Sequence, residues 1–156
     1  MVQTVVELGL GTIPSPSGSG ELLLVDEWSC RLVFVPIARS RRTWPETAVA
    51  TFRWCQQAVF GYPNDEAKRG HLEYGDLSYG FYEVRDSEWP RRLEAFNRRT
   101  FPDTTTGWDR VRHFVVVCHE DLIEVLAHDV AVEIHRRPFD EVALDALRRN
   151  LDEHLG

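Results

Sequence analysis

The stretch RHFVVVCHEDLIEVLAHDVAVEI, residues 112–134, decides the predicted fold, because it contains two β-rich runs joined by two acidic residues. The runs cover residues 112–119 and 122–128, and Glu120-Asp121 between them suits a tight hairpin. Successive side chains of a strand point to opposite faces of its sheet. One face of this hairpin is apolar throughout, and we therefore expect helices to cover it. Its members are Phe114, Val116, Cys118, Ile123, Val125 and Ala127.

The opposite face of the hairpin mixes apolar side chains with histidines and one glutamate, Glu124. If the loop has two residues, His119 lies opposite Leu122, and Glu124 lies diagonal to His119 across the strands. A carboxylate among apolar neighbours, with an imidazole within reach, is typical of acid–base chemistry. A second interpretation remains open, in which Glu124 faces solvent and His119 lies beside the turn.

Three further β-rich runs lie outside this hairpin, at residues 22–25, 30–37 and 79–85. The first two are separated by four residues, which predicts a second antiparallel hairpin. Residues 11–20, just before it, contain two prolines, three serines and three glycines. This composition is typical of a turn or a flexible linker.

Three helices are predicted from apolar side chains that recur at helical spacing. The first begins at Thr43, where Thr-Trp-Pro-Glu fits a capping box. The second follows Asp86 or Ser87 as its N-cap, and the third begins at Asp140. The expected fold is therefore α+β, an antiparallel sheet of hairpins with about three helices packed on one face. The expected buried stripes are Val49, Phe52, Cys55 and Val59; Trp89, Leu93 and Phe96; and Leu144, Leu147 and Leu151.

The composition fits one folded domain, since the 156 residues are 43% hydrophobic and 11% aromatic. We expect residues 1–20 to form a tail or linker and residues 21–156 to form this domain. The 25 acidic side chains outnumber the 18 basic ones, which gives a net charge of −7. Nucleic acids and membranes are therefore not expected as partners, because affinity for phosphates comes from clustered Lys and Arg. Three distant cysteines and the lack of a signal-peptide pattern favour a cytoplasmic protein.

Residues 61–78 show neither a helical nor a strand period. Long stretches of this kind inside a domain are binding loops, lids or disordered segments. This one contains Asp65, His71 and Tyr74, whose side chains suit ligand binding. On the strand that follows, Glu83 shares a face with an arginine, which fits either a charged patch or a weak surface ion pair. Both interpretations of Glu83 remain open.

Four residues together could hold a divalent metal ion through nitrogen and oxygen atoms: His71, His113, His119 and Glu124. The sequence contains no HxH or HExxH motif, so no cofactor is predicted and a divalent metal remains an alternative. It also contains no GxSxG, GxGxxG or P-loop motif. Cys118 lies on the expected core face and is interpreted as a buried thiol.

Three segments of the chain resemble a widespread family of uncharacterised bacterial proteins. They are FGYPNDEAKRGHLEYGDLSYGFYEV (60–84), DSEWPRRLEAFNR (86–98) and RHFVVVCHEDLIEVLA (112–127). The resemblance covers about residues 55–127, with Leu72 where a proline is more usual and Cys118 where an aromatic residue is. It implies neither an activity nor a substrate. It does imply that three residues form a set: His71, His119 and Glu124.

Three functions remain open. The first is a domain that binds a small molecule or a protein partner in a pocket between loop 61–78 and hairpin 112–128. The second is an enzyme in which Glu124 and His119 act as acid and base. The third is an acidic protein of the inhibitor or immunity type, whose charge steers it to a basic partner.

A concave pocket favours the first two functions, and a flat acidic surface favours the third. The sequence predicts no oligomeric state. The expected catalytic residues are Glu124, His119 and His71, and the expected ligand-binding residues are Tyr74, His113, Arg112, Asp65 and Glu83.

Overall fold

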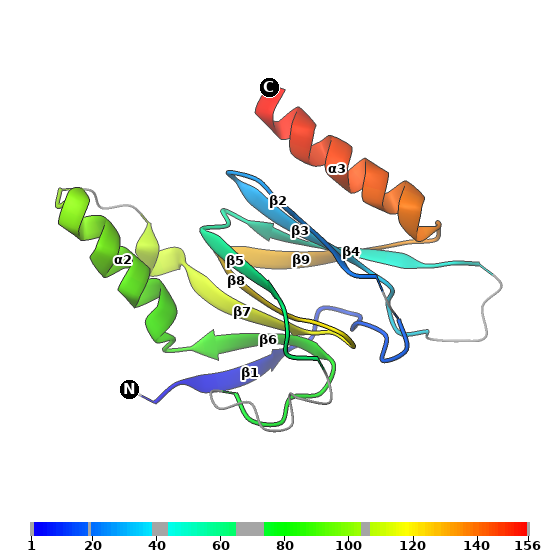
Figure 1. Cartoon of the computed structure of the whole chain (residues 1–156), viewed down its shortest axis with the longest axis horizontal. Helices are drawn as coiled ribbons and strands as arrows, with labels where there is room; N and C mark the ends of the chain where they lie inside the picture. The colour runs from blue at the N-terminus through cyan, green and yellow to red at the C-terminus, as the bar shows by residue number, and fades with distance from the viewer. Residues whose placement is uncertain (1, 19, 39–43, 65–73, 104–106, 156) are drawn as a thin grey trace.

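Two antiparallel sheets face each other in the computed structural model of the chain, which describes residues 2–18, 20–38, 44–64, 74–103 and 107–155 (Figure 1). The five-stranded sheet has the order β1-β6-β7-β8-β5, and the four-stranded sheet has the order β2-β3-β4-β9. The strands are β1 (Thr4–Leu8), β2 (Leu22–Val25), β3 (Ser29–Phe34), β4 (Thr47–Arg53), β5 (Gln57–Gly61), β6 (Gly80–Arg85), β7 (Arg112–Val117), β8 (Leu122–Ala127) and β9 (Asp129–His135). The α-helices are α2 (Glu88–Thr100) and α3 (Phe139–Leu155), and a short 3₁₀ helix, η1, covers Trp108–Arg110.

The main hydrophobic core lies between the two sheets. Phe34 packs against Phe81 and Phe52 against Phe114, with ring centroids 5.7 Å apart in both pairs. All four side chains are at most 1% exposed. The apolar face of the 112–127 hairpin is therefore covered by the second sheet, and the prediction that helices cover it is wrong. Two sheets that each have one apolar face can bury both faces against each other.

The prediction of a helix from Thr43 to about residue 59 is also wrong where the structure describes this segment, since Thr43 itself lies outside the described residues. Residues 47–53 form β4, which pairs with β3 on one side and β9 on the other. Phe52 points into the core between the sheets, while Val49 on the opposite face packs under α3. A strand that is buried on both faces lacks polar alternation, so its apolar residues can mimic helical spacing.

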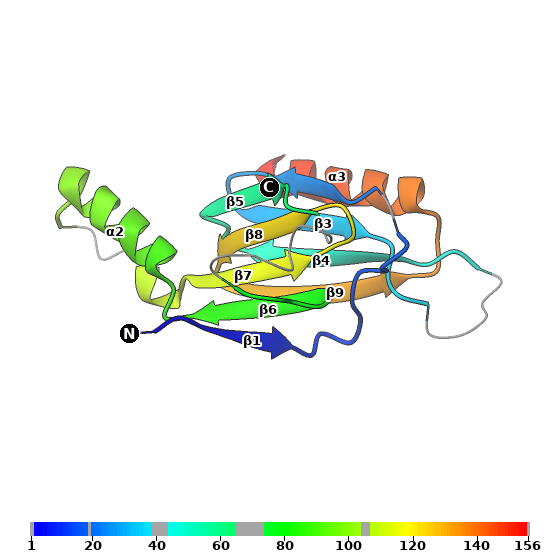
Figure 2. The same cartoon turned by 60° about the horizontal axis from the view of Figure 1, so that its bottom comes forward.

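The described part of the chain contains two α-helices, and they do not share one face as predicted (Figure 2). Helix α3 lies on the outer face of the four-stranded sheet, where Val142 and Ala146 pack against Val33 and Val49. Helix α2 lies beside the five-stranded sheet and contains no buried residue. The expected buried stripes are therefore wrong for both helices: Phe96 of α2 is exposed, and so are Leu144, Leu147 and Leu151 of α3.

Other local predictions are confirmed. The β2 and β3 strands form an antiparallel hairpin, and the Oγ atom of Ser87 caps α2 by accepting the N–H of Trp89 at 3.2 Å.

Residues 4–8, inside the segment expected to be a tail or linker, form β1 and pair with β6. Among the described helices, none has both the length and the apolar composition needed to cross a bilayer.

Candidate functional site

His113 and Glu124 lie on neighbouring strands at the outer face of the five-stranded sheet. Glu124 of β8 is opposite Val115, and His113 of β7 is opposite Leu126. The two polar residues are therefore diagonal neighbours, a position from which long side chains meet. The His113 Nε2 atom lies 3.2 Å from Glu124 Oε1. The strand register alone brings this imidazole and this carboxylate together.

The predicted register of this hairpin is wrong by two residues, because the connection contains four residues and not two. Val117, not His119, lies opposite Leu122, and the N–H of Cys118 donates to the Asp121 carbonyl at 3.0 Å. A shift of two residues keeps every side chain on its predicted face but changes its neighbour. Glu124 therefore stays on the expected face of the sheet.

His119, the predicted catalytic partner of Glu124, lies in the connection beyond the end of the strand pair. Its Nε2 atom is 3.2 Å from Glu120 Oε1. Glu124 lies two residues inside the strand pair, next to His113, which the sequence had assigned to ligand binding. The structure therefore joins Glu124 to a different histidine from the one predicted.

His113 is held in place from both sides of its ring. Ser87 Oγ lies 2.8 Å from Nδ1, and the Trp89 and Tyr74 rings meet the imidazole edge to face. The whole residue is only 3% exposed. Because Ser87 also caps α2, the helix end and strand β7 are tied together at this histidine. The imidazole is therefore fixed before any ligand arrives.

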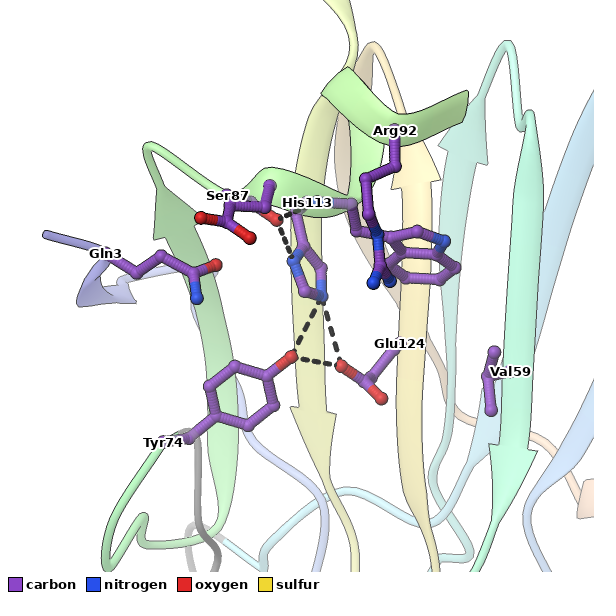
Figure 3. A pocket seen from close by; sticks show the side chains of 9 residues that line it. Gln3, Val59, Tyr74, Ser87, Arg92, His113 and Glu124 are labelled. Atoms are coloured by element: carbon purple, nitrogen blue, oxygen red, sulfur yellow. Dashed lines mark hydrogen bonds and ion pairs between the residues drawn. The ribbon is translucent and has the colours of Figure 1, made fainter. Parts of the chain in front are cut away.

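A chain of hydrogen bonds links four side chains of this cluster (Figure 3). One set of hydrogen positions satisfies every contact: Ser87 donates to Nδ1 of His113, and Nε2–H of His113 donates to Glu124. The Tyr74 hydroxyl donates to the same Glu124 oxygen and lies 3.5 Å from His113 Nε2. Two donors therefore converge on one carboxylate whose side chain is 22% exposed.

The cluster borders a pocket of about 270 Å³. His113 and Glu124 come from the sheet, Tyr74 from the segment before β6, and Trp89 and Arg92 from α2 (Figure 3). Pockets that combine a few convergent polar groups with apolar walls are the usual sites of small-molecule binding. The complete lining is Gln3, Val59, Tyr74, Ser87, Glu88, Trp89, Arg92, His113 and Glu124.

Arg112 and Glu83, both predicted to bind ligand, lie on the other face of the five-stranded sheet. Arg112 precedes His113 on β7, so its side chain points to the opposite face. Its guanidinium makes two hydrogen bonds of 2.8 Å to Glu83 and lies 4.9 Å from the centre of the Phe114 ring. The bonded Arg112 lowers the pKa of the Glu83 carboxyl below its ordinary value, although burial opposes this shift. The pair therefore bonds two strands at the edge of the core and does not line the pocket.

We expect Glu83→Gln to weaken the acid sensitivity of folding. The pKa of Glu83 is lower in the folded than in the unfolded chain, so its charge stabilises the fold at neutral pH. This contribution is lost as the pH falls below about 4.3, the unfolded value, and through the lowered folded value. The variant should lose about 1 kcal/mol of unfolding free energy at neutral pH, and its difference from wild type should shrink as the pH falls below about 4.3.

Urea denaturation at a series of pH values measures this difference. Glu120→Gln is the matched control, since this carboxylate is 58% exposed and lies in the hairpin connection. If the Glu83 variant and wild type differ equally at neutral and acid pH, the charge of Glu83 does not stabilise the fold.

Two predicted site residues, His71 and Asp65, lie outside the described residues. Of the four residues considered for a metal ion, the structure therefore describes His113, His119 and Glu124. Within the described part of the chain, no group of three or more His, Cys, Asp and Glu side chains is arranged to hold a metal.

Sequence reasoning did not assign several lining residues to the site. A signal for Ser87 and Trp89 was present, because Ser-x-Trp follows a strand and opens a helix there. Val59 and Gln3 gave no such signal, since their positions depend on how distant strands pair. Arg92 resembles any other exposed helix arginine in the sequence.

Comparisons with known proteins found no matching family model, no matching curated protein and no matching solved structure.

Proposed function

We propose that this protein binds a small polar molecule in the pocket above His113 and Glu124. The observation that carries the proposal is the convergence of the Tyr74 hydroxyl and the His113 imidazole on one Glu124 oxygen at the floor of the pocket. Fixed donors of this kind hold a carboxylate in one orientation, which reduces the entropy lost on binding. A site organised in advance in this way is expected of a binding pocket.

The chemistry of the floor indicates the class of ligand. A carboxylate is a charged acceptor with about four lone-pair sites. A ligand with an amine, amidine or hydroxyl group can donate to Glu124, and a charged donor makes the stronger bond. Arg92 at the pocket wall can receive an anionic or polar end of the same molecule. Val59 and Trp89 provide apolar contact between these ends.

A screen of small polar fragments by ligand-observed NMR tests this proposal. We expect the fragments that bind to carry a donor group, and Glu124→Gln to weaken their affinity at least tenfold, since the charged acceptor is lost. Glu133→Gln is the matched control, because this carboxylate is 60% exposed on β9 of the other sheet. The proposal is wrong if the same fragments bind the Glu124 variant as tightly as wild type.

An enzyme is the second candidate, favoured by the continuous hydrogen-bond path from Ser87 through His113 to Glu124. Along such a path Ser87 and His113 hold the Glu124 carboxylate in position, where it can take a proton from a bound molecule and return it to the product, as in general acid–base catalysis. The two candidates differ in one readout. If bound fragments are converted to products by wild type but not by Glu124→Gln, the protein is an enzyme, and unchanged fragments favour the binding function.

A further inference from the structure

Helix α2 has an apolar stripe that the described residues cover only in part. Trp89, Leu93 and Phe96 recur at helical spacing on one side. The Trp89 ring packs on His113 and Leu93 is half-buried, whereas Phe96 is 68% exposed. None of the 13 residues is buried, and the helix extends away from the sheets (Figures 1 and 2). Isolated helices of this length are marginal in water, and most helices gain their stability by packing an apolar face. The stripe therefore indicates a contact outside the molecule.

Helix α3 has a second uncovered stripe on the side away from its sheet. Val142 and Ala146 are buried against the four-stranded sheet, at 2% and 3% exposure. Leu144, Leu147 and Leu151 lie on the opposite side and are 53%, 42% and 56% exposed. Three leucines in a row at helical spacing form a contiguous apolar surface, which is typical of an interaction site.

The two stripes lie on helices of opposite charge. Helix α2 contains four arginines and two glutamates, whereas α3 contains three aspartates and two glutamates against two arginines. Several of these charges form ion pairs within the chain: Arg91 and Arg98 of α2, and Glu141, Asp145 and Glu153 of α3. Arg92 and Arg99 of α2 and Asp140 and Asp152 of α3 are outside these pairs. Pairing α2 with a second α2 would place arginines against arginines, and pairing α3 with α3 would place aspartates together. Pairing α2 with α3 joins two apolar stripes and brings opposite charges together, which favours this contact over the symmetric ones.

We propose that α2 of one copy of the chain packs against α3 of a second copy. Within one molecule the two helices lie on different sheets and cannot meet, as both views show (Figures 1 and 2). The contact is heterologous, so until a ring closes one end copy keeps a free α2 and the other end copy keeps a free α3. Copies therefore add head to tail into a ring or an open chain.

The contact is weak and depends on salt. Helices of 13 and 17 residues offer a smaller area than stable dimers bury. Part of the attraction comes from exposed charges, which salt screens. We expect the average molecular mass of the wild type to rise with protein concentration at low salt and to return toward the 18.0 kDa monomer at high salt.

Two complementary variants test the heterologous contact. Phe96→Glu places a charge in the apolar stripe of α2 and leaves α3 unchanged. Leu147→Arg places a charge in the apolar stripe of α3 and leaves α2 unchanged. We expect each variant alone to sediment as a monomer at concentrations where wild type assembles. An equimolar mixture should form a one-to-one dimer and nothing larger, because only one intact α2 and one intact α3 remain per pair. Trp44→Glu, an equally exposed aromatic outside both helices, should assemble like wild type.

Analytical ultracentrifugation measures the masses of the species in these samples. Both replaced side chains are exposed, so thermal melting should show that the variants are folded as well as wild type. A wild type that remains a monomer at every concentration overturns the proposal. It is equally overturned if wild type assembles but the mixed variants do not form the dimer.

Discussion

Replacing Phe114 with alanine is expected to lower the free energy of unfolding by about 3–5 kcal/mol. The ring is 1% exposed and packs against Phe52 of the facing sheet and under the Arg112 guanidinium. Its removal loses the transfer free energy of the ring and leaves a cavity between two sheets that cannot close fully. Urea denaturation followed by tryptophan fluorescence measures the loss.

Phe96→Ala is the matched control, since this ring is 68% exposed on α2. We expect its effect in dilute solution to stay within about 0.5 kcal/mol. If both variants lose the same unfolding free energy, Phe114 is not buried between the two sheets.

The second large effect is expected at His113. His113→Ala removes a buried ring and leaves the Ser87 hydroxyl without its imidazole and the Glu124 carboxylate without one donor. Such a loss costs about 2–3 kcal/mol of unfolding free energy. His119→Ala should cost no more than about 0.5 kcal/mol, because this side chain is 35% exposed in the hairpin connection.

The comparison of the two histidine variants also tests the register of the β7–β8 hairpin. With a two-residue loop, His119 would be the buried neighbour of Glu124 and its variant would be the less stable one. Equal or reversed losses would therefore contradict the observed pairing of Val117 with Leu122.

The part of the site that the sequence predicted is the face on which Glu124 lies. Side chains two residues apart on a strand lie on the same face of the sheet. The predicted face of Glu124 is therefore unchanged by an error of two residues in the loop. The histidine that meets Glu124 depends on the full register. Loop length sets that register, and Glu120-Asp121 fits a two-residue turn as well as the last two residues of the four-residue connection that forms.

The strand at residues 47–53, which completes the second sheet between β3 and β9, could not be predicted for a related reason. Residues 47–53 are covered on both faces, so their sequence has no alternation to distinguish a buried strand from a helix. The predicted buried stripe of α3 is wrong for a different reason. This helix has apolar side chains on two sides, and their spacing alone does not say which side packs against the sheet. The large leucines remain outside, while the smaller Val142 and Ala146 fit the close approach to the sheet.

The pocket above His113 and Glu124 is tested most directly by crystals of the wild-type protein soaked with the amine- and hydroxyl-bearing fragments from the solution screen. We predict fragment density with a donor atom within hydrogen-bond distance of the Glu124 carboxylate, beside the Tyr74 hydroxyl. Fragments that gather elsewhere, for example beside the exposed Trp28 and Trp54 rings, while none reaches Glu124, would contradict the assignment of this pocket as the binding site.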